Sequence, residues 1–217
     1  MKRRIDAVIF DMDGLIIDSE PIWRKAEIEA FKEIGFLFTE QMCVQTMGMR
    51  IDEVVHYWWL KLKWSSPSEK KVVNSIQSKM IDFIKNDGEL LPGVLTSLKL
   101  LKKHEIPVAL ASSSAMVLIN TVIESLEIKN YFKIVHSAEN ETAGKPDPSV
   151  FLTAAKLLNI APKNCLVLED SKAGMNAGLN ANMKTIVIPE KGTLPTWSKR
   201  AHLTLKSMKD FNIELLN

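Results

Sequence analysis

The sequence contains little cysteine, no long apolar run and no strong excess of either charge. Its two cysteines, Cys43 and Cys165, lie far apart and form no C-x-x-C pair, so neither a disulfide framework nor a zinc site is indicated. No apolar stretch approaches the roughly 18 residues that are needed to span a membrane. The net charge is +2, and the lysines and arginines are spread along the chain. We therefore expect neither a membrane nor a nucleic acid among its partners.

The composition is that of an ordinary globular protein. A chain of 217 residues with 46% hydrophobic and 25% charged residues can bury a substantial core, as one domain or as one domain with a smaller insert. The first residues, "MKRRIDAVIFDMDG", place basic residues before an apolar run, as a signal peptide does, but Asp6, Asp11 and Asp13 interrupt that run. We expect a cytoplasmic protein, and a monomer, although no motif reports the oligomeric state.

Five short apolar segments indicate strands. They are "DAVIF", "IPVALAS", "FKIVHS", "NCLVLED" and "MKTIVIP", and the later ones alternate with helix-length segments such as "GVLTSLKLLKKHE" and "DPSVFLTAAKLLN". Continuous apolar strands that alternate with helices are typical of a parallel sheet covered on both faces. The sequence therefore predicts an α/β fold with a Rossmann-like parallel-sheet core.

Residues 20–87 differ in character, because their segments indicate helices throughout and no strand. The pattern is that of a helical insert placed between the first strand and the rest of the α/β domain. We predict a core formed by residues 1–17 and 90–217, with a helical cap domain, residues 18–89, inserted after the first strand.

Polar residues gather where the predicted strands end. They are Asp11 and Asp13, Ser112, and Glu169 and Asp170. In a parallel sheet the ligand binds beyond the carboxyl ends of the strands, so these side chains should converge. Clustered carboxylates suit Mg²⁺, which binds carboxylates, waters and phosphate oxygens. Lys145 in "AGKPDP" adds a positive charge for phosphate oxygens. The set suggests phosphoryl transfer.

Four of these motifs, taken in order, resemble those of the haloacid dehalogenase superfamily, in its phosphatase branch with a helical cap. "DMDG" matches the first family motif, the serine after "VALA" the second, the lysine of "GKP" the third and "EDS" the fourth. The resemblance covers nearly the whole chain. A single D-x-D pair is weak evidence, but four motifs in family order are specific.

The resemblance implies a role for each acidic residue. Asp11 would be the nucleophile that forms an aspartyl-phosphate, and Asp13 would protonate the leaving alcohol and then activate water. Mg²⁺ would be held by Asp11, by the backbone carbonyl of Asp13 and by Asp170, with Glu169 bound directly or through water. Asp13 also favours an oxygen leaving group, because an alkoxide needs a proton and a halide does not.

The resemblance also implies phosphate-binding and cap residues. Ser112, its neighbour Ser113 and Lys145 would bind the phosphoryl oxygens. Glu20, Trp23 and Arg50 are the expected substrate contacts from the cap. The cap tryptophans either fill the core or surface of the cap or form a platform on which a sugar stacks. These are Trp58, Trp59 and Trp64.

The alternatives to a sugar phosphatase are a phosphonate-cleaving enzyme, a sugar phosphomutase and a catalytically silent binding protein. Phosphonate-cleaving relatives need a cap lysine, where this chain has Arg50, and sugar phosphomutases carry a histidine where it has Trp23. The stretches "FDMDGLIIDSEPIW", "MGMRIDEVV" and "LLPGV" look most like bacterial hexitol and 2-deoxyglucose 6-phosphate phosphatases. We expect a Mg²⁺-dependent hydrolase of hexose 6-phosphates or related small phosphorylated metabolites. A sugar phosphomutase similar to β-phosphoglucomutase, or a catalytically silent binding protein, is the alternative.

Overall fold

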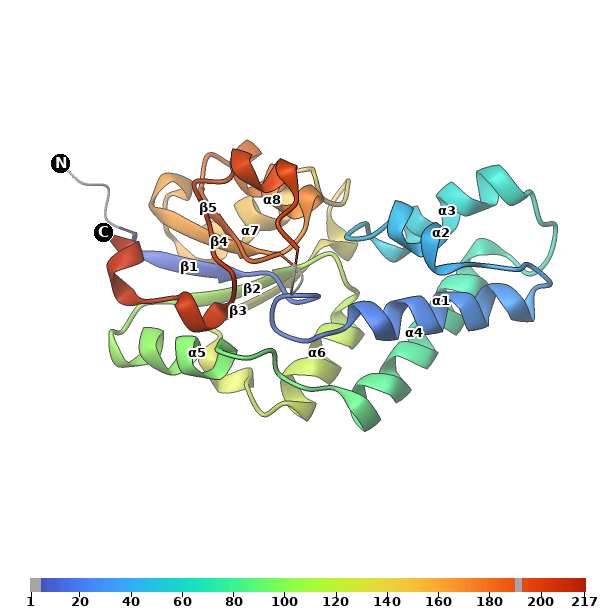
Figure 1. Ribbon diagram of the computed structural model, residues 1–217, viewed down its shortest axis with the longest axis horizontal. Coiled ribbons are helices and arrows are strands. Elements are labelled where there is room, and N and C mark those ends of the chain that lie inside the picture. The colour runs from blue at the N-terminus through green and yellow to red at the C-terminus, as the bar shows by residue number, and fades with distance from the viewer. Residues whose placement is uncertain (1–4, 190–192) are drawn as a thin grey trace.

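A six-stranded parallel sheet lies at the centre of the computed structural model, which describes residues 5–189 and 193–217 (Figure 1). The strand order is β3-β2-β1-β4-β5-β6, and every neighbouring pair is parallel. The strands are β1 (Ala7–Phe10), β2 (Val108–Ser112), β3 (Ile134–Ser137), β4 (Cys165–Glu169), β5 (Lys184–Val187) and β6 (Leu203–Thr204). The predicted α/β fold class is confirmed, and the two-residue β6 is a strand that the sequence did not reveal.

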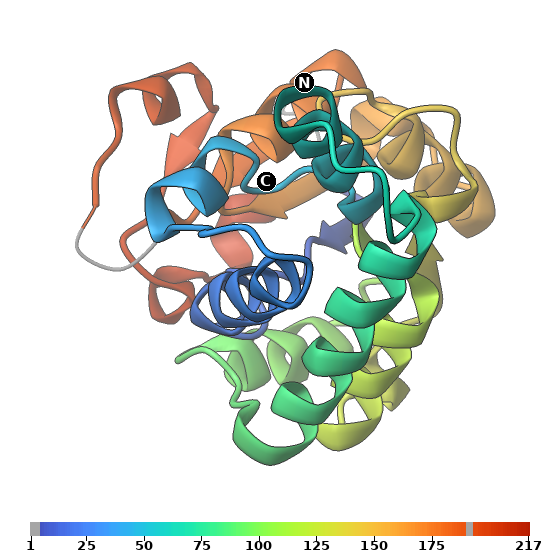
Figure 2. The ribbon, with the colours of Figure 1, turned by 90° about the vertical axis from the view of Figure 1, so that its right-hand side faces the viewer.

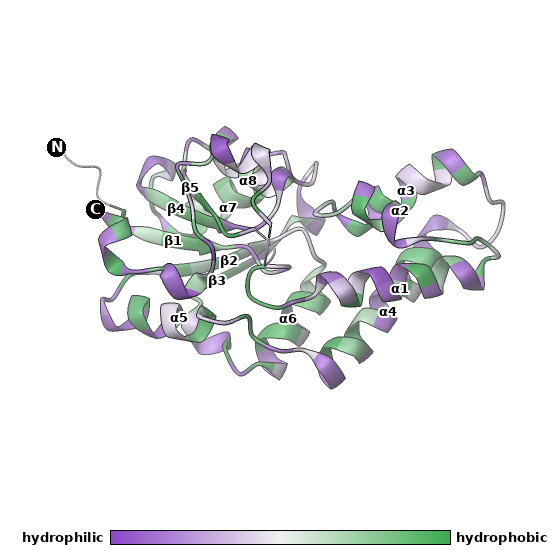
Figure 3. Ribbon diagram, viewed as in Figure 1, coloured by the Kyte–Doolittle hydropathy of each residue, from purple (hydrophilic) through white to green (hydrophobic). Residues whose placement is uncertain are grey.

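The central strands are buried on both faces, which is why their sequences are continuous apolar runs. All residues of β1, β2 and β4 are buried. Helices α5 (Val94–Lys103) and α6 (Met116–Ser125) cover one face of the sheet, and α7 (Ser149–Leu158) and α8 (Lys172–Asn180) cover the other (Figure 1). Figure 3 shows the hydrophobic strands enclosed between these layers.

Four helices between β1 and α5 extend from one end of the sheet, as Figures 1 and 2 show. They are α1 (Glu20–Glu33), α2 (Glu40–Gln45), α3 (Ile51–Leu62) and α4 (Glu69–Asp87). Phe31 stacks on Phe38 with ring centroids 4.1 Å apart, and Trp58 and Trp64 meet these rings edge-on. Trp58 and Trp64 therefore pack in the interior of the helical region, where they cannot serve as a sugar platform.

The two connections to this helical region run side by side. Ile17 pairs with Leu90 in a β-bridge, and the amide of Leu91 donates to the carbonyl of Ile16 at 2.9 Å. Helix α4 also packs against α6 of the sheet layer, so one apolar cluster continues from the sheet into the helices. The division into residues 1–17 and 90–217 against residues 18–89 stays a prediction.

The remaining elements are short 3-10 helices. They are η1 (Lys129–Tyr131), η2 (Ala138–Asn140), η3 (Pro162–Asn164), η4 (Thr196–Arg200), η5 (Met208–Asp210) and η6 (Ile213–Leu216). Across residues 5–189 and 193–217, the helices are all too short or too polar to cross a lipid bilayer.

Candidate active site

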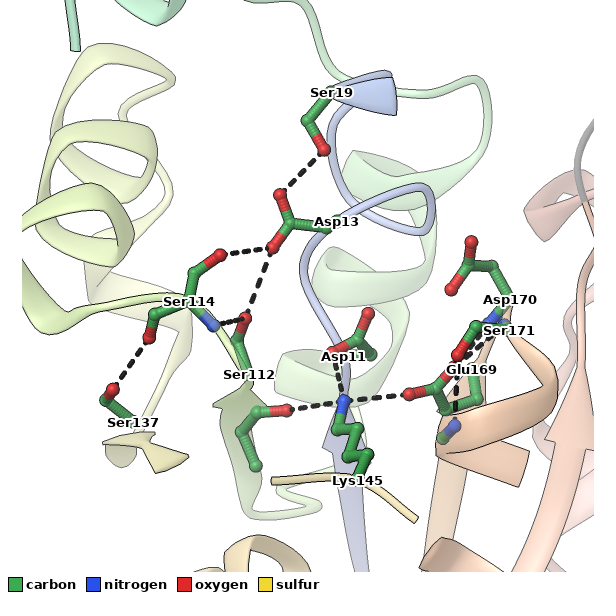
Figure 4. A network of polar contacts seen from close by, with 12 residues as sticks. Asp11, Asp13, Ser19, Ser112, Ser114, Ser137, Lys145, Glu169, Asp170 and Ser171 are labelled. Carbon is green, nitrogen blue, oxygen red and sulfur yellow. Dashed lines mark hydrogen bonds and ion pairs between the residues drawn. The ribbon is translucent and has the colours of Figure 1, made fainter. Parts of the chain in front are cut away.

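The carboxyl ends of β1, β2 and β4 bring the predicted polar residues to one edge of the sheet. Asp11 follows β1 directly, Ser112 ends β2, and Glu169 and Asp170 lie at the end of β4. Figure 4 shows these side chains converging beside Lys145. With helix α1 and the segment 46–49 they line a single cavity. The sheet topology thus assembles the predicted set in one pocket.

Lys145 is the cation at the centre of this cluster. Its Nζ donates to Oδ1 of Asp11 and, at 2.7 Å, to Oε1 of Glu169, and the residue is only 3% exposed. Burial alone would lower the pKa of Lys145, but the negative charges of Asp11 and Glu169 outweigh burial and raise it. Lys145 therefore stays protonated and fixes the side chain of Asp11.

The neighbouring carboxylates are crowded and buried. Burial raises the pKa of Asp11 to about 8, with a further rise from the charges of Glu169 and Asp13 and an opposing effect of Lys145. Burial, followed by the charge of Glu169, also raises the pKa of Asp170 well above its usual range. One carboxylate oxygen from each of Asp11, Glu169 and Asp170 lies within 4.8 Å of the others. This donor set fits a hard divalent cation, whose charge would relieve the repulsion.

Two glycines make room for these carboxylates. Gly14 adopts a φ of +73°, and a Cβ there would collide with the carboxylate of Asp170. A Cβ at Gly174, in the first turn of α8, would collide with the carboxylate of Glu169. The backbone at both positions therefore closes around the acidic cluster, which supports a built site over a chance gathering of acids.

Asp13 belongs to a separate network and points away from Lys145 (Figure 4). Its Oδ1 accepts hydrogen bonds from Ser19 Oγ at 2.7 Å and from Trp23 Nε1 at 2.8 Å. Its Oδ2 accepts from Ser114 Oγ at 2.7 Å and from Ser112 Oγ at 3.3 Å. Strand β1 ends at Phe10, so the alternation of side chains between the two faces of a strand does not extend to Asp11 and Asp13. Four donors instead fix the carboxylate of Asp13 beside the pocket.

The sequence did not reveal Ser19 or Ser114 as partners of Asp13. Ser114 follows two other serines, and no spacing rule distinguishes the three hydroxyls. The structure does distinguish them, because Ser112 is bonded to Asp13 and to the amide of Ser114. Ser113 Oγ is buried in the pocket lining and has no hydrogen-bond partner among the described residues. Of the two predicted phosphate-binding serines, Ser113 has the hydroxyl that is left for a ligand.

Glu169 is fully engaged with protein groups. Its Oε1 accepts from Lys145, and its Oε2 accepts from the amides of Asp170 and Ser171 at 2.9 Å each and from Ser171 Oγ at 3.0 Å. These contacts make Glu169 the counter-ion of Lys145 and the acid that fixes the turn before α8. The contact of Glu169 with a metal ion stays a prediction. Both of its carboxylate oxygens already accept hydrogen bonds from the protein.

Glu20 and Trp23 line the side of the pocket formed by α1 and the segment 46–49, here called the cap side, and their contact with substrate stays a prediction. Arg50 does not lie among the described lining residues. Arg50 Nη1 donates to the backbone carbonyls of Ala138 and Glu141 at 3.1 and 2.9 Å. Its Nε and Nη2 donate to Asp52 at 2.6 and 2.8 Å. The guanidinium of Arg50 therefore joins the start of α3 to the segment 138–141 after β3, and its expected contact with substrate stays a prediction.

A second contact reinforces this junction. The carboxylate of Glu53, on the first turn of α3, accepts a hydrogen bond from the amide of Gly144 at 2.9 Å. Gly144 directly precedes Lys145. Arg50 and Glu53 thus connect the helical region to the loop that carries the central lysine.

Comparison with known proteins identifies similar chains. Residues 8–188 match the family described as haloacid dehalogenase-like hydrolase. The chain is 38% identical over 188 residues to hexitol phosphatase B of Escherichia coli K12, covering 86% of this chain and 85% of that protein. It is 30% identical to the phosphorylated carbohydrates phosphatase of Thermotoga maritima, covering 84% of each. The crystal structure of β-phosphoglucomutase from Clostridium difficile superimposes with a TM-score of 0.85 at 26% identity, over 98% of this chain and 95% of that one.

Proposed function

Because the chain belongs to the haloacid dehalogenase-like hydrolase family, we propose that it is a Mg²⁺-dependent phosphatase of hexose or hexitol phosphates. Membership confirms the resemblance that the motifs predicted and the enzyme class, a phosphoric monoester hydrolase. The proposal extends this class to a metal requirement, to individual residues and to a substrate.

One observation carries the proposal: two aspartates with different surroundings lie beside one pocket. Asp11 lies in the acidic cluster with Lys145 and Asp170, and Asp13 lies among neutral hydroxyl and indole donors. A nucleophile and an acid/base group require such different surroundings, since one must attack phosphorus and the other must exchange a proton.

The chain's own groups can perform each step. Asp11 Oδ attacks phosphorus and the ester oxygen leaves, so the P–O bond to the alcohol breaks as the aspartyl-phosphate forms. Asp13 supplies the proton that the leaving alkoxide needs and takes one from the water that hydrolyses the intermediate. Lys145 and the hydroxyl of Ser113 neutralise and orient the phosphoryl oxygens. A silent binding protein would be expected to lack one of these residues, and the sequence retains all of them.

We propose that Mg²⁺ is held by Asp11, Asp170 and Glu169. Glu169 would bind the ion while keeping its hydrogen bonds to the protein. When bound, the ion supplies positive charge that offsets the repulsion between a carboxylate nucleophile and a phosphate dianion. The raised pKa values of Asp11 and Asp170 agree with this assignment, because burial first and neighbouring carboxylates second disfavour the charged forms, which a bound cation would stabilise.

A sugar phosphomutase is the second candidate, favoured by the structural likeness to a β-phosphoglucomutase. By the family resemblance a mutase would carry a histidine where this chain has Trp23. The indole N–H of Trp23 donates to Asp13, and indole cannot accept or exchange a proton as imidazole does. Hydrolysis is the better supported outcome.

Release of inorganic phosphate in the presence of Mg²⁺ tests the proposal. The panel contains hexitol and hexose 6-phosphates, pentose and glycerol phosphates, nucleotides and β-glucose 1-phosphate. Release concentrated on the hexitol and hexose esters is expected. Conversion of β-glucose 1-phosphate to the 6-phosphate with little release would favour the mutase, and no turnover of any ester would reject both.

A further inference from the structure

The cap side of the pocket contains a buried acid that the phosphoryl-transfer steps do not use. Glu27 lies on α1, lines the cavity and is 6% exposed. Among the residues that the structure describes, none donates a hydrogen bond to its Oε2, which is itself buried, and the thiol of Cys43 is the neighbouring donor that interacts with the carboxyl group. Leaving a buried carboxylate oxygen unpaired destabilises the folded state. Such an atom in a ligand cavity points to a ligand that pairs with it.

The position of Glu27 relates it to the reacting groups. Glu20, Trp23 and Glu27 are spaced three and four residues apart, so they share one face of α1, and all three line the cavity. Trp23 contacts Asp13, the proposed acid for the leaving oxygen. Glu27 lies one turn further along the helix, about 6 Å at a rise of 1.5 Å per residue. A leaving alcohol that starts at Asp13 and follows α1 reaches Glu27 after a few carbon atoms.

The charges of the residues that line the pocket restrict which leaving alcohols it can accept. Lys145 is the only cation among the described lining residues, and it is already paired with Asp11 and Glu169. The cap side presents Glu20 and Glu27, so a second phosphate or a carboxylate on the leaving group would meet like charge. Hydroxyl groups suit Oε2, because they can donate to a carboxyl oxygen whether or not the group is ionised.

We propose that Glu27 is a specificity-determining residue that accepts a hydrogen bond from a hydroxyl of the leaving group and selects neutral, polyhydroxylated alcohols. This inference rests on the proposed phosphatase function and assigns one residue to its substrate choice. Burial raises the pKa of Glu27 to about 7, which agrees with a carboxyl group held in the pocket without a cation. Unlike Arg50, Glu27 gave no motif signal, since one glutamate in an amphipathic helix is unremarkable in sequence.

Kinetics with two esters of equal chain length test the inference. Sorbitol 6-phosphate carries hydroxyls along its chain, and n-hexyl phosphate has none. The unmodified protein should prefer sorbitol 6-phosphate in kcat/KM by about tenfold or more, because a pocket that pairs with hydroxyls rejects analogues lacking them. An equal kcat/KM for the two esters would overturn the inference without using any variant.

Two substitutions then locate the preference at Glu27. Glu27→Leu should shrink the sorbitol to hexyl preference by about tenfold, the loss of one good hydrogen bond. Glu27→Gln keeps an acceptor oxygen and should retain the preference within about threefold. Glu29→Gln, a half-buried acid of the same helix that lies 3.9 Å from Lys79, is the matched control and should change nothing.

The possible failures are distinguishable. If the unmodified protein hydrolyses no ester with Mg²⁺, the proposed function fails and takes the inference with it. If both esters are hydrolysed and Glu27→Leu lowers them equally, or leaves the preference intact, the phosphatase stands and the role of Glu27 is overturned. Fructose 1,6-bisphosphate gives a further arm: poor turnover relative to fructose 6-phosphate is expected, and equal turnover contradicts the charge selection.

Discussion

The sheet side and the cap side of the pocket differ in how completely their polar groups are paired. On the sheet side, Lys145 bridges two carboxylates and Asp13 accepts four hydrogen bonds. On the cap side, Glu27 keeps a buried oxygen unpaired in a lining that also contains apolar residues such as Met49. A paired network holds reacting groups at fixed positions before substrate arrives, whereas an unpaired group gains a partner only when substrate binds. The sheet side is thus built for the chemistry and the cap side for the choice of alcohol.

The largest expected effect comes from the sheet side. Asp11→Asn removes the nucleophile and should lower the rate of phosphate release by about 10⁴-fold or more. Asparagine keeps the shape, and Lys145 retains Glu169, so the thermal midpoint should stay within a few degrees. Phosphate release and a circular-dichroism melt measure the two effects. Asp82→Asn, an exposed acid of α4, is the control; full activity in Asp11→Asn would remove Asp11 from the chemistry.

Metal removal acts on the same side. EDTA should stop turnover and excess Mg²⁺ should restore it, because Asp11, Glu169 and Asp170 place three oxygens within 4.8 Å. Mg²⁺ at 100 times its dissociation constant should also raise the free energy of unfolding by about 2.7 kcal/mol. Turnover assays and melting curves with EDTA, and with EDTA plus Mg²⁺, separate the effects. Turnover that persists in EDTA, with no shift on adding Mg²⁺, would refute the metal assignment.

These two expectations could be formed from the sequence because they depend on motifs at strand ends. A buried parallel strand must end at the ligand edge of the sheet, so "FDMDG" and "VLEDS" already located Asp11 and Asp170. Ser114 could not be chosen over Ser112 and Ser113, because the turn after β2 decides which hydroxyl faces Asp13. The contacts of Arg50 with the carbonyls of residues 138 and 141 could not be predicted either, because any residue at those positions would provide a carbonyl.

On the cap side, the burial of Glu27 should make the free energy of unfolding depend on pH. Burial, with a contribution from Glu20 and an opposing hydrogen bond with Cys43, raises the pKa of Glu27 from 4.5 to about 7. Between those pH values the folded protein retains a proton that the unfolded chain has released, so the free energy of unfolding falls as pH rises. In Glu27→Gln this side chain does not ionise, so its contribution to that fall in the free energy of unfolding disappears.

The measurement is urea unfolding at pH 5 and pH 8. Relative to the unmodified protein, Glu27→Gln should gain about 1–3 kcal/mol between pH 5 and pH 8. Glu29→Gln is the control and should run parallel to the unmodified protein. A parallel curve for Glu27→Gln as well would mean that its carboxyl group ionises as it does in water, which contradicts a buried acid.

The smallest effect is expected at the junction between the two sides. Arg50→Ala removes two hydrogen bonds to backbone carbonyls and a surface pair with Asp52, of which the carbonyl bonds contribute most. Because Arg50 positions α3 against the sheet domain, kcat/KM should fall about 3- to 10-fold, and equally, for sorbitol 6-phosphate and p-nitrophenyl phosphate. Arg200→Ala, an exposed arginine that donates to Asn176, is the control. A rise in KM confined to sorbitol 6-phosphate would instead place Arg50 at the substrate, and the cap side would then contain a cation that competes with Glu27 in selecting the alcohol.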